Sequence, residues 1–185
     1  MHRNLLFALL SFCILIASCK SPEARRPVQQ NSGSFIKESA ERNIEIYKKE
    51  EAQIARLIEK DTKNVYIASE SGFWYYYEEK DTTATVFPKL GDVVTFTYDI
   101  KMLDGDVVVS EEENGLQTYR VDQTNQELIS GLRDGLKLMK EGETITFLFP
   151  SFKAFGYYGL ENKLGTNIPV QSTVSLKSIE QSQEN

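Results

Sequence analysis

Alternation of apolar and polar residues, the period of a half-buried β-strand, dominates the second half of the chain. Val93 to Met102 places every second residue on one apolar face, and Thr144 to Phe149 does the same. Asp104-Gly105 predicts a tight turn into a following strand. Together, alternation and β-rich composition predict strands at Val65–Ile67, Phe73–Tyr77, Val93–Met102, Val107–Val109, Tyr119–Val121, Thr144–Phe149 and Thr173–Ile179.

One segment among these strands has the period of a helix. Glu127 to Met139 places five apolar residues on one helical stripe: Leu128, Ile129, Leu132, Leu136 and Met139. Gly131 and Gly135 lie one turn apart within it, and each destabilises the helix by about 1 kcal/mol relative to Ala. Their presence predicts that another part of the chain packs closely against the helix backbone there. An antiparallel sheet wrapped on one short central helix predicts an α+β domain over residues 63–185.

A second helical pattern precedes this domain. Ser34 is a candidate N-cap for an amphipathic helical arm, residues 34–62, whose helix runs to about Lys60. The stripe packs either on its own domain or on a second copy, which would make a homodimer through this helix. Its apolar positions are Phe35, Ile36, Ala40, Ile44, Tyr47, Ile54, Leu57 and Ile58.

The start of the chain has the features of a signal peptide. Leu5 to Ile16 is an apolar run after a basic start, and it is shorter than the roughly 20 residues that span a membrane. Ile16-Ala17-Ser18-Cys19 resembles the lipobox of bacterial lipoproteins, which implies removal of residues 1–18 and lipidation of Cys19. An ordinary secretory signal with an incidental cysteine is the alternative. Residues 19–33 are polar and contain two prolines, as in a flexible tether.

Charge and composition exclude several classes of function. The chain has 21 basic and 27 acidic residues, a net charge of −6, and loss of Arg3 with the signal leaves −7. An acidic chain without a basic stripe argues against a nucleic-acid partner. The single histidine is His2, so the mature chain has no imidazole for catalysis or metal binding. We therefore expect no metal and no cofactor, and we interpret Glu111 to Glu113 as a solvated loop.

Residues 127–169 carry the most specific pattern. The segment ELISGLRDG, a Lys-Glu-Gly turn, an alternating strand, Ala154-Phe155-Gly156 and Ile168-Pro169 follow one another along the chain. This order resembles the FK506-binding class of peptidyl-prolyl isomerases. The resemblance begins at Phe87-Pro88 and reaches Ile179, about half the chain. It implies an apolar cup between sheet and helix, in which proline-containing polypeptide clients are isomerised.

The same resemblance assigns the site residues. Tyr98, Val109, Ile129 and Phe155 take the catalytic positions, and the Ile129 backbone N–H takes the ligand-anchoring role. Substrate-binding positions fall on Val108, Tyr119, Val121, Leu128, Leu132, Ala154, Ile168 and Leu176. From the pattern alone, such apolar residues would equally suit the core of a sheet-and-helix domain.

Three positions depart from the family pattern. Val108-Val109 replaces the usual Phe-Asp pair, Leu132 replaces a tryptophan, and Phe155 lacks a tyrosine hydroxyl. The missing polar groups predict weakened catalysis. The alternatives to an active isomerase are therefore a chaperone or assembly module with little or no activity, and a purely structural lipoprotein.

The lipobox and the domain together predict a location. A lipidated Cys19 implies stable anchoring in a membrane. Lys20-Ser21 after it contains no aspartate, which favours the outer membrane and a domain that faces the periplasm. Among family members, the arrangement resembles the gliding-motility-associated lipoproteins of the Bacteroidetes, which implies a role in maturing envelope or motility proteins.

Overall fold

The computed structural model describes residues 32–123 and 128–182. The predicted signal peptide, most of the predicted tether with Cys19, and Glu127 lie outside these residues. The chain divides into two units at Ser39, and the second unit contains the sheet together with the helix from Ser39 onward.

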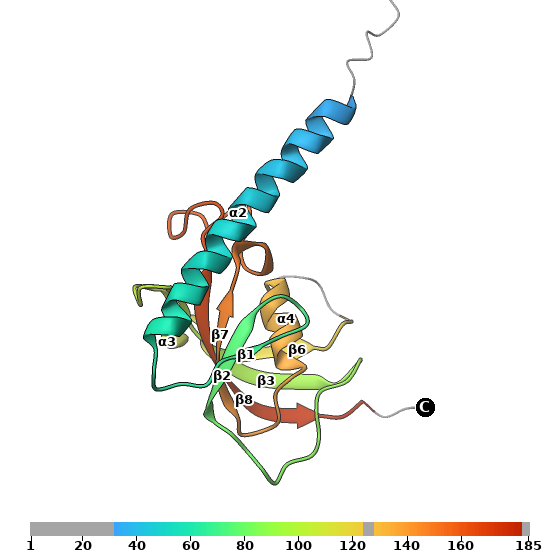
Figure 1. Cartoon of the computed structure of the whole chain (residues 1–185). Helices are drawn as coiled ribbons and strands as arrows, with labels where there is room; N and C mark the ends of the chain where they lie inside the picture. Colours follow the sequence, from blue (N-terminus) through green and yellow to red (C-terminus); the bar gives the residue numbers. More distant parts are fainter. Residues whose placement is uncertain (1–31, 124–127, 183–185) are drawn as a thin grey trace, which may run out of the picture. The chain divides into compact units, whose positions relative to one another are not determined.

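The described residues form an antiparallel sheet of eight strands (Figure 1). Its hydrogen-bonded order is β1-β2-β7-β8-β3-β6, with β4 paired to both β5 and β8. The predicted α+β class is confirmed. The strands are β1 (Ile67–Ala68), β2 (Trp74–Glu79), β3 (Val93–Tyr98), β4 (Ile100–Met102), β5 (Val107–Val109), β6 (Gln117–Arg120), β7 (Thr144–Phe149) and β8 (Val170–Glu180).

The helices are α2 (Ser32–Lys60), α3 (Glu111–Asn114) and α4 (Ser130–Leu136), with a 3-10 turn η1 (Ser151–Lys153) after β7. Helix α4 lies on the face of the sheet to which Phe147 and Phe149 point. Both phenylalanines are fully buried, as the alternation of β7 predicts. The main core therefore lies between α4 and this face.

Two glycines set the distance between α4 and the sheet. A Cβ atom on Gly131 would lie 2.6 Å from Cδ1 of Phe149 and 2.9 Å from the Lys153 carbonyl oxygen. A Cβ atom on Gly135 would lie 2.9 Å from two ring atoms of Phe147. Real Cβ atoms do not approach so closely, so the helix backbone rests directly on the two rings. The predicted close approach at both glycines is confirmed.

An aromatic cluster supports this contact from the sheet. The rings of Phe147 and Phe149 are stacked, with centroids 5.4 Å apart and an interplanar angle of 8°. Phe73, which precedes β2, meets both rings edge-on, at 5.7 Å and 5.3 Å. Aromatic pairs in such geometries contribute about 0.5–1.5 kcal/mol beyond their buried area. The cluster gives α4 a flat, rigid support.

Helix α2 from Ser39 onward packs over the opposite face of the sheet. Ile54 is fully buried, and the groove beneath the helix is floored by Tyr76 and Gln171. These two residues pair with Thr146 and Leu148, which alternate with Phe147 and so point away from α4. The second unit is thus layered as helix, sheet, helix, and of the two alternatives for the helical stripe the residues from Ser39 onward show packing on the chain's own domain.

Three further predictions about helices need correction. Helix α4 is shorter than Glu127 to Met139, because i to i−3 hydrogen bonds close it, from Leu138 N to Gly135 O and from Met139 N to Leu136 O. Helix α2 begins at Ser32, so Ser34 is not its N-cap. The predicted loop at Glu111 to Glu113 is the exposed helix α3, whose N-cap is Ser110.

Replacing Gly131 with Ala should destabilise the protein. The new methyl group meets the Phe149 ring and a backbone carbonyl, and overpacking of this kind costs about 1–3 kcal/mol, only partly offset by the helix propensity of Ala. Urea unfolding measures the loss. Gly165→Ala is the control, because its Cβ would meet Ile168 at an ordinary 3.7 Å. Equal stability of the two variants would contradict the close packing of α4.

Candidate functional site: an apolar cup at the start of helix α4

All twelve residues that the resemblance assigns to the cup belong to the hydrophobic core of the domain or pack against it, as other apolar residues such as Phe73 and Val94 also do. Four are buried and form its floor: Tyr119, Val121, Leu132 and Leu176. Eight are only partly buried and pack against that floor: Tyr98, Val108, Val109, Leu128, Ile129, Ala154, Phe155 and Ile168. We call this set the apolar cup. Cys19, the predicted lipidation site, lies outside the described residues.

The floor of the cup is wholly apolar at its centre. Leu132 comes from α4 and Leu176 from β8, and each is 1% exposed. Tyr119 on β6 is 5% exposed, and its hydroxyl oxygen accepts a hydrogen bond from the Asp122 backbone N–H at 3.0 Å. The hydroxyl of Tyr119 therefore has a partner within the fold, and only the ring contributes to the floor.

Tyr98 brings the polar hydroxyl that remains at the rim. It ends β3, pairs with Val174 of β8, and its backbone carbonyl accepts a hydrogen bond from Nδ2 of Asn114 at 2.9 Å. Burial raises the pKa of the Tyr98 phenol, which keeps the hydroxyl protonated at neutral pH. Among the described residues this hydroxyl has no hydrogen-bond partner, so it can donate to a ligand.

Ile129 occupies the entrance to α4. It is the N-cap residue of the helix, and its carbonyl accepts the first helical bond, from Arg133 N at 3.2 Å. Its own backbone N–H belongs to the groups that a helix start leaves without an intrahelical partner. The position is consistent with the ligand-anchoring role that the resemblance implies for this N–H.

The wall formed by β5 contains only hydrocarbon. Val109 pairs with Ile100 of β4, and both Val108 and Val109 are half-buried against the cluster. Ser110 follows directly, and its side chain caps α3 rather than contributing to the cup. This wall therefore offers dispersion contacts and desolvation, but no carboxylate.

Backbone hydrogen bonds hold the segment that carries Phe155. The carbonyl of Ser151 accepts bonds from Ala154 N at 2.9 Å and from Gly156 N at 2.8 Å, on either side of Phe155. The Gly156 carbonyl accepts from Asn167 N at 2.8 Å, which fixes the chain just before Ile168. Ser130 Oγ on α4 donates to the Lys153 carbonyl at 3.3 Å. The segment is thus tied to α4 and to the strand that follows it.

A buried carboxylate from α2 supports this segment. Glu50 is 3% exposed, and its Oε2 and Oε1 accept hydrogen bonds from the backbone N–H and the hydroxyl of Ser151, at 2.8 Å and 2.6 Å. The rings of Tyr47 and Phe152 meet beside it, with centroids 4.8 Å apart. Sequence reasoning missed Glu50, because a glutamate among other charged residues of an amphipathic helix carries no sign of burial.

Within residues 32–123 and 128–182, His, Cys, Asp and Glu form no group of three or more that could hold a metal ion. In the same ranges, no helix is both long enough and apolar enough to cross a bilayer.

Comparisons with known proteins identify the family of the domain. The sequence model of the FKBP-type peptidyl-prolyl cis-trans isomerase family matches residues 84–177. A protein of Neisseria meningitidis serogroup B, described as a probable FKBP-type peptidyl-prolyl cis-trans isomerase FkpA, is 34% identical over 93 residues. That match covers 50% of this chain and 33% of the relative, so the chain spans about a third of its length.

Two solved structures share the fold. A peptidyl-prolyl cis-trans isomerase from Pseudomonas syringae pv. tomato has a TM-score of 0.56 at 20% identity, over 71% of this chain and 92% of that one. FkpA from Escherichia coli has a TM-score of 0.56 at 21% identity, over 98% of this chain and 83% of that one. At these identities the likeness concerns the fold alone.

Replacing Glu50 with Ala should lower the free energy of unfolding by about 2–3 kcal/mol, since a bond to a charged group is lost and two buried donors of Ser151 are left without a partner. Chemical denaturation measures the loss, and the NMR signals of Phe155 should shift with it. Glu51→Ala removes an exposed neighbouring carboxylate and is the control. A Glu51 variant as unstable as the Glu50 variant would contradict the buried link.

Proposed function

Because the chain belongs to the FKBP-type peptidyl-prolyl cis-trans isomerase family, we propose that its apolar cup catalyses rotation about Xaa–Pro bonds in polypeptide clients. The proposal is supported by eight assigned residues that are only partly buried and pack against the hydrophobic core, to which the other four assigned residues belong. Such a surface suits the pyrrolidine ring of proline.

The reaction needs little chemistry from the protein. Amide resonance resists rotation by roughly 18–20 kcal/mol, and the uncatalysed step takes tens to hundreds of seconds. The planar amide is more polar than the twisted one, so a dry, hydrocarbon-lined surface disfavours the ground state. Binding the twisted geometry more tightly than the planar one then lowers the barrier. Neither effect requires a nucleophile or an imidazole.

Polar groups at the rim orient the client. The protonated Tyr98 hydroxyl and the Ile129 backbone N–H are donors for the carbonyl groups that flank the proline. Phe155 closes the cup from the segment after η1, as a ring without a hydroxyl. The charge that a family member would place on β5 is absent, because Val109 stands there.

We propose that the protein acts at the cell envelope. Support comes from the sequence Ile16-Ala17-Ser18-Cys19, which suits lipidation of Cys19 and anchoring in a membrane. Lys20-Ser21 favours the outer membrane, with the isomerase domain facing the periplasm. The combination of lipobox, helical arm and isomerase domain further suggests a role in maturing envelope proteins, including those of gliding motility.

A homodimer through α2 forms part of this proposal. The first half of the helix exposes large apolar side chains, with Phe35 at 70%, Ile36 at 69% and Ile44 at 51% exposure. A second copy would remove this surface from water, which favours association.

The second candidate is a proline-binding chaperone or assembly module with little turnover. Val109 and Phe155 favour it, since neither carries the polar group that the family pattern places there. Such a module would bind clients in the same cup without accelerating isomerisation.

Turnover of a proline tetrapeptide in a coupled protease assay separates the two candidates. We expect the protein to exceed the background rate, and Tyr98→Phe to lower kcat/KM about threefold to tenfold, the equivalent of one lost hydrogen bond. The melting temperature should not change, because the hydroxyl has no partner among the described residues. A background rate combined with retained peptide binding would establish the inactive module instead.

Replacing Val109 with Asp should raise kcat/KM about tenfold, because a carboxylate at this wall restores about 1.4 kcal/mol of polar stabilisation in the transition state. Val107→Asp is the matched control, since Val107 lies on the same strand and is 60% exposed. An equal gain in both variants, or none in either, would show that the β5 residue facing the cup has been assigned wrongly.

A further inference from the structure

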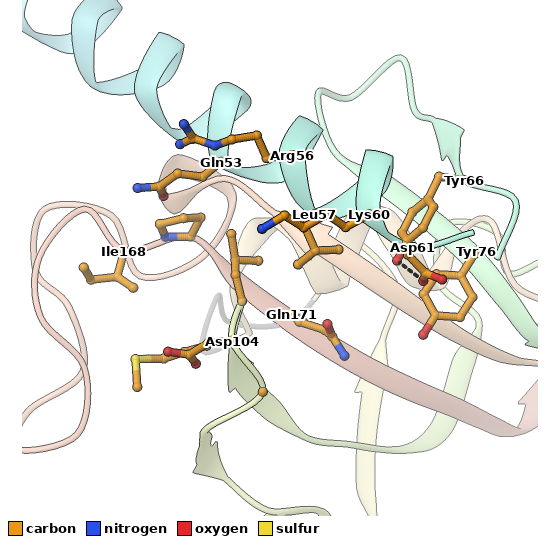
Figure 2. Close-up of a pocket in the computed structure, with 14 residues that line it drawn as sticks. Gln53, Arg56, Leu57, Lys60, Asp61, Tyr66, Tyr76, Asp104, Ile168 and Gln171 are labelled. Atoms are coloured by element: carbon orange, nitrogen blue, oxygen red, sulfur yellow. Dashed lines mark hydrogen bonds between the residues drawn. The ribbon is translucent and has the colours of Figure 1, made fainter. Parts of the chain in front are cut away.

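A hollow lies on the face of the sheet over which α2 packs (Figure 2). It is a groove of 770 Å³ between α2 and the turn that joins β4 to β5. Gln53, Arg56, Leu57 and Lys60 line it from the helix, and Tyr76 and Gln171 from the sheet. The family pattern assigns nothing to this place except Ile168, which belongs to both the groove and the apolar cup.

Two cations without partners distinguish one end of the groove. Arg56 and Lys60 lie one turn apart on α2, and neither makes a hydrogen bond or ion pair with any described residue. Like charges at this spacing repel each other. Figure 2 shows both side chains, together with Gln53, reaching toward the side on which Ile168 lies. A bound anion there would remove the repulsion.

The carboxylates of the groove do not neutralise these cations. Asp61 accepts hydrogen bonds from Lys63 N at 3.0 Å, Asn64 Nδ2 at 2.8 Å and Tyr66 Oη at 2.9 Å. It lies at the end of the groove away from Ile168 (Figure 2). Asp104 accepts a bond from the backbone N–H of Asp106 at 3.2 Å.

The groove also has an apolar lining, and Asp104 lies on the same side as Ile168 (Figure 2). Leu57, Leu103 and Pro169 line the groove beside the shared Ile168. A ligand that suits this end therefore combines a negative charge with a hydrocarbon side chain. An extended polypeptide with an acidic residue next to an aliphatic one has both features.

We propose that this groove binds the part of a client polypeptide that flanks its proline, and that it selects an acidic residue there. The inference rests on the proposed function, because the proline occupies the cup while the flanking segment passes Ile168 into the groove. Arg56 and Lys60 are then specificity-determining residues of the isomerase, supplied by the helical arm rather than by the family domain.

Fluorescence anisotropy of the full chain with labelled peptides tests the proposal. Each peptide contains one Leu-Pro pair and, on either side of it, Glu-Leu or its uncharged equivalent Gln-Leu. At low ionic strength we expect the better Glu peptide to bind about fivefold more tightly than its Gln counterpart, the effect of one or two exposed ion pairs. Arg56→Gln with Lys60→Gln should abolish the difference. Lys48→Gln with Lys49→Gln, exposed on the same helix outside the groove, should preserve it.

Equal affinity for the Glu and Gln peptides would overturn the proposal, as would an equal loss of preference in the Lys48/Lys49 control. A background rate on the proline tetrapeptide would instead overturn the proposed catalysis. The difference in affinity between the Glu and Gln peptides is measured by binding alone. It would still decide whether the groove prefers an acidic residue. Urea unfolding confirms that both double variants remain folded.

Discussion

The contact of a helix backbone with two phenylalanine rings is the constraint on which the rest of the domain depends. Gly131 and Gly135 remove the side chains that would separate α4 from Phe149 and Phe147. Because the helix backbone packs directly on these rings, Leu132 is buried in the floor of the cup. Ile129, the N-cap residue of the helix, is only partly buried, at its rim. The same glycine that touches Phe149 also leaves room for the Lys153 carbonyl, so one contact positions the helix, the strand and the segment that carries Phe155.

The sheet separates two surfaces of different chemistry. On the α4 side, apolar side chains surround the Tyr98 phenol, which suits a reaction driven by desolvation. On the α2 side, a groove is lined by two cations that have no ion-pair partner among the described residues, Arg56 and Lys60, and by carboxylates that accept hydrogen bonds. Ile168 belongs to both surfaces. Glu50 connects the two sides. It belongs to α2 and accepts a hydrogen bond from Ser151, whose carbonyl in turn accepts bonds from the residues before and after Phe155.

The sequence predicted the features of the fold that depend on residues close together in the chain. Alternation located β7 to the residue, and the spacing of Gly131 and Gly135 predicted the close approach of α4. The resemblance selected twelve residues that belong to the hydrophobic core or pack against it. The sequence left open whether α2 docks on its own domain or on a second copy, and it could not decide between them because the anchor is a carboxylate whose partner lies 101 residues away. The groove was equally hidden, since Arg56 and Lys60 look like ordinary solvated residues until a fold places them over Tyr76 and Gln171.

The buried link between Glu50 and Ser151 also bears on how the molecule can be divided. A recombinant fragment that starts at residue 63, the predicted start of the isomerase domain, discards Ile54 and Glu50 together. It uncovers Leu148, which is fully buried in the intact chain, and returns the two Ser151 donors to solvent. The compact unit starts at Ser39, so the helix from Ser39 to Lys60 is part of the same unit as the sheet rather than a detachable spacer.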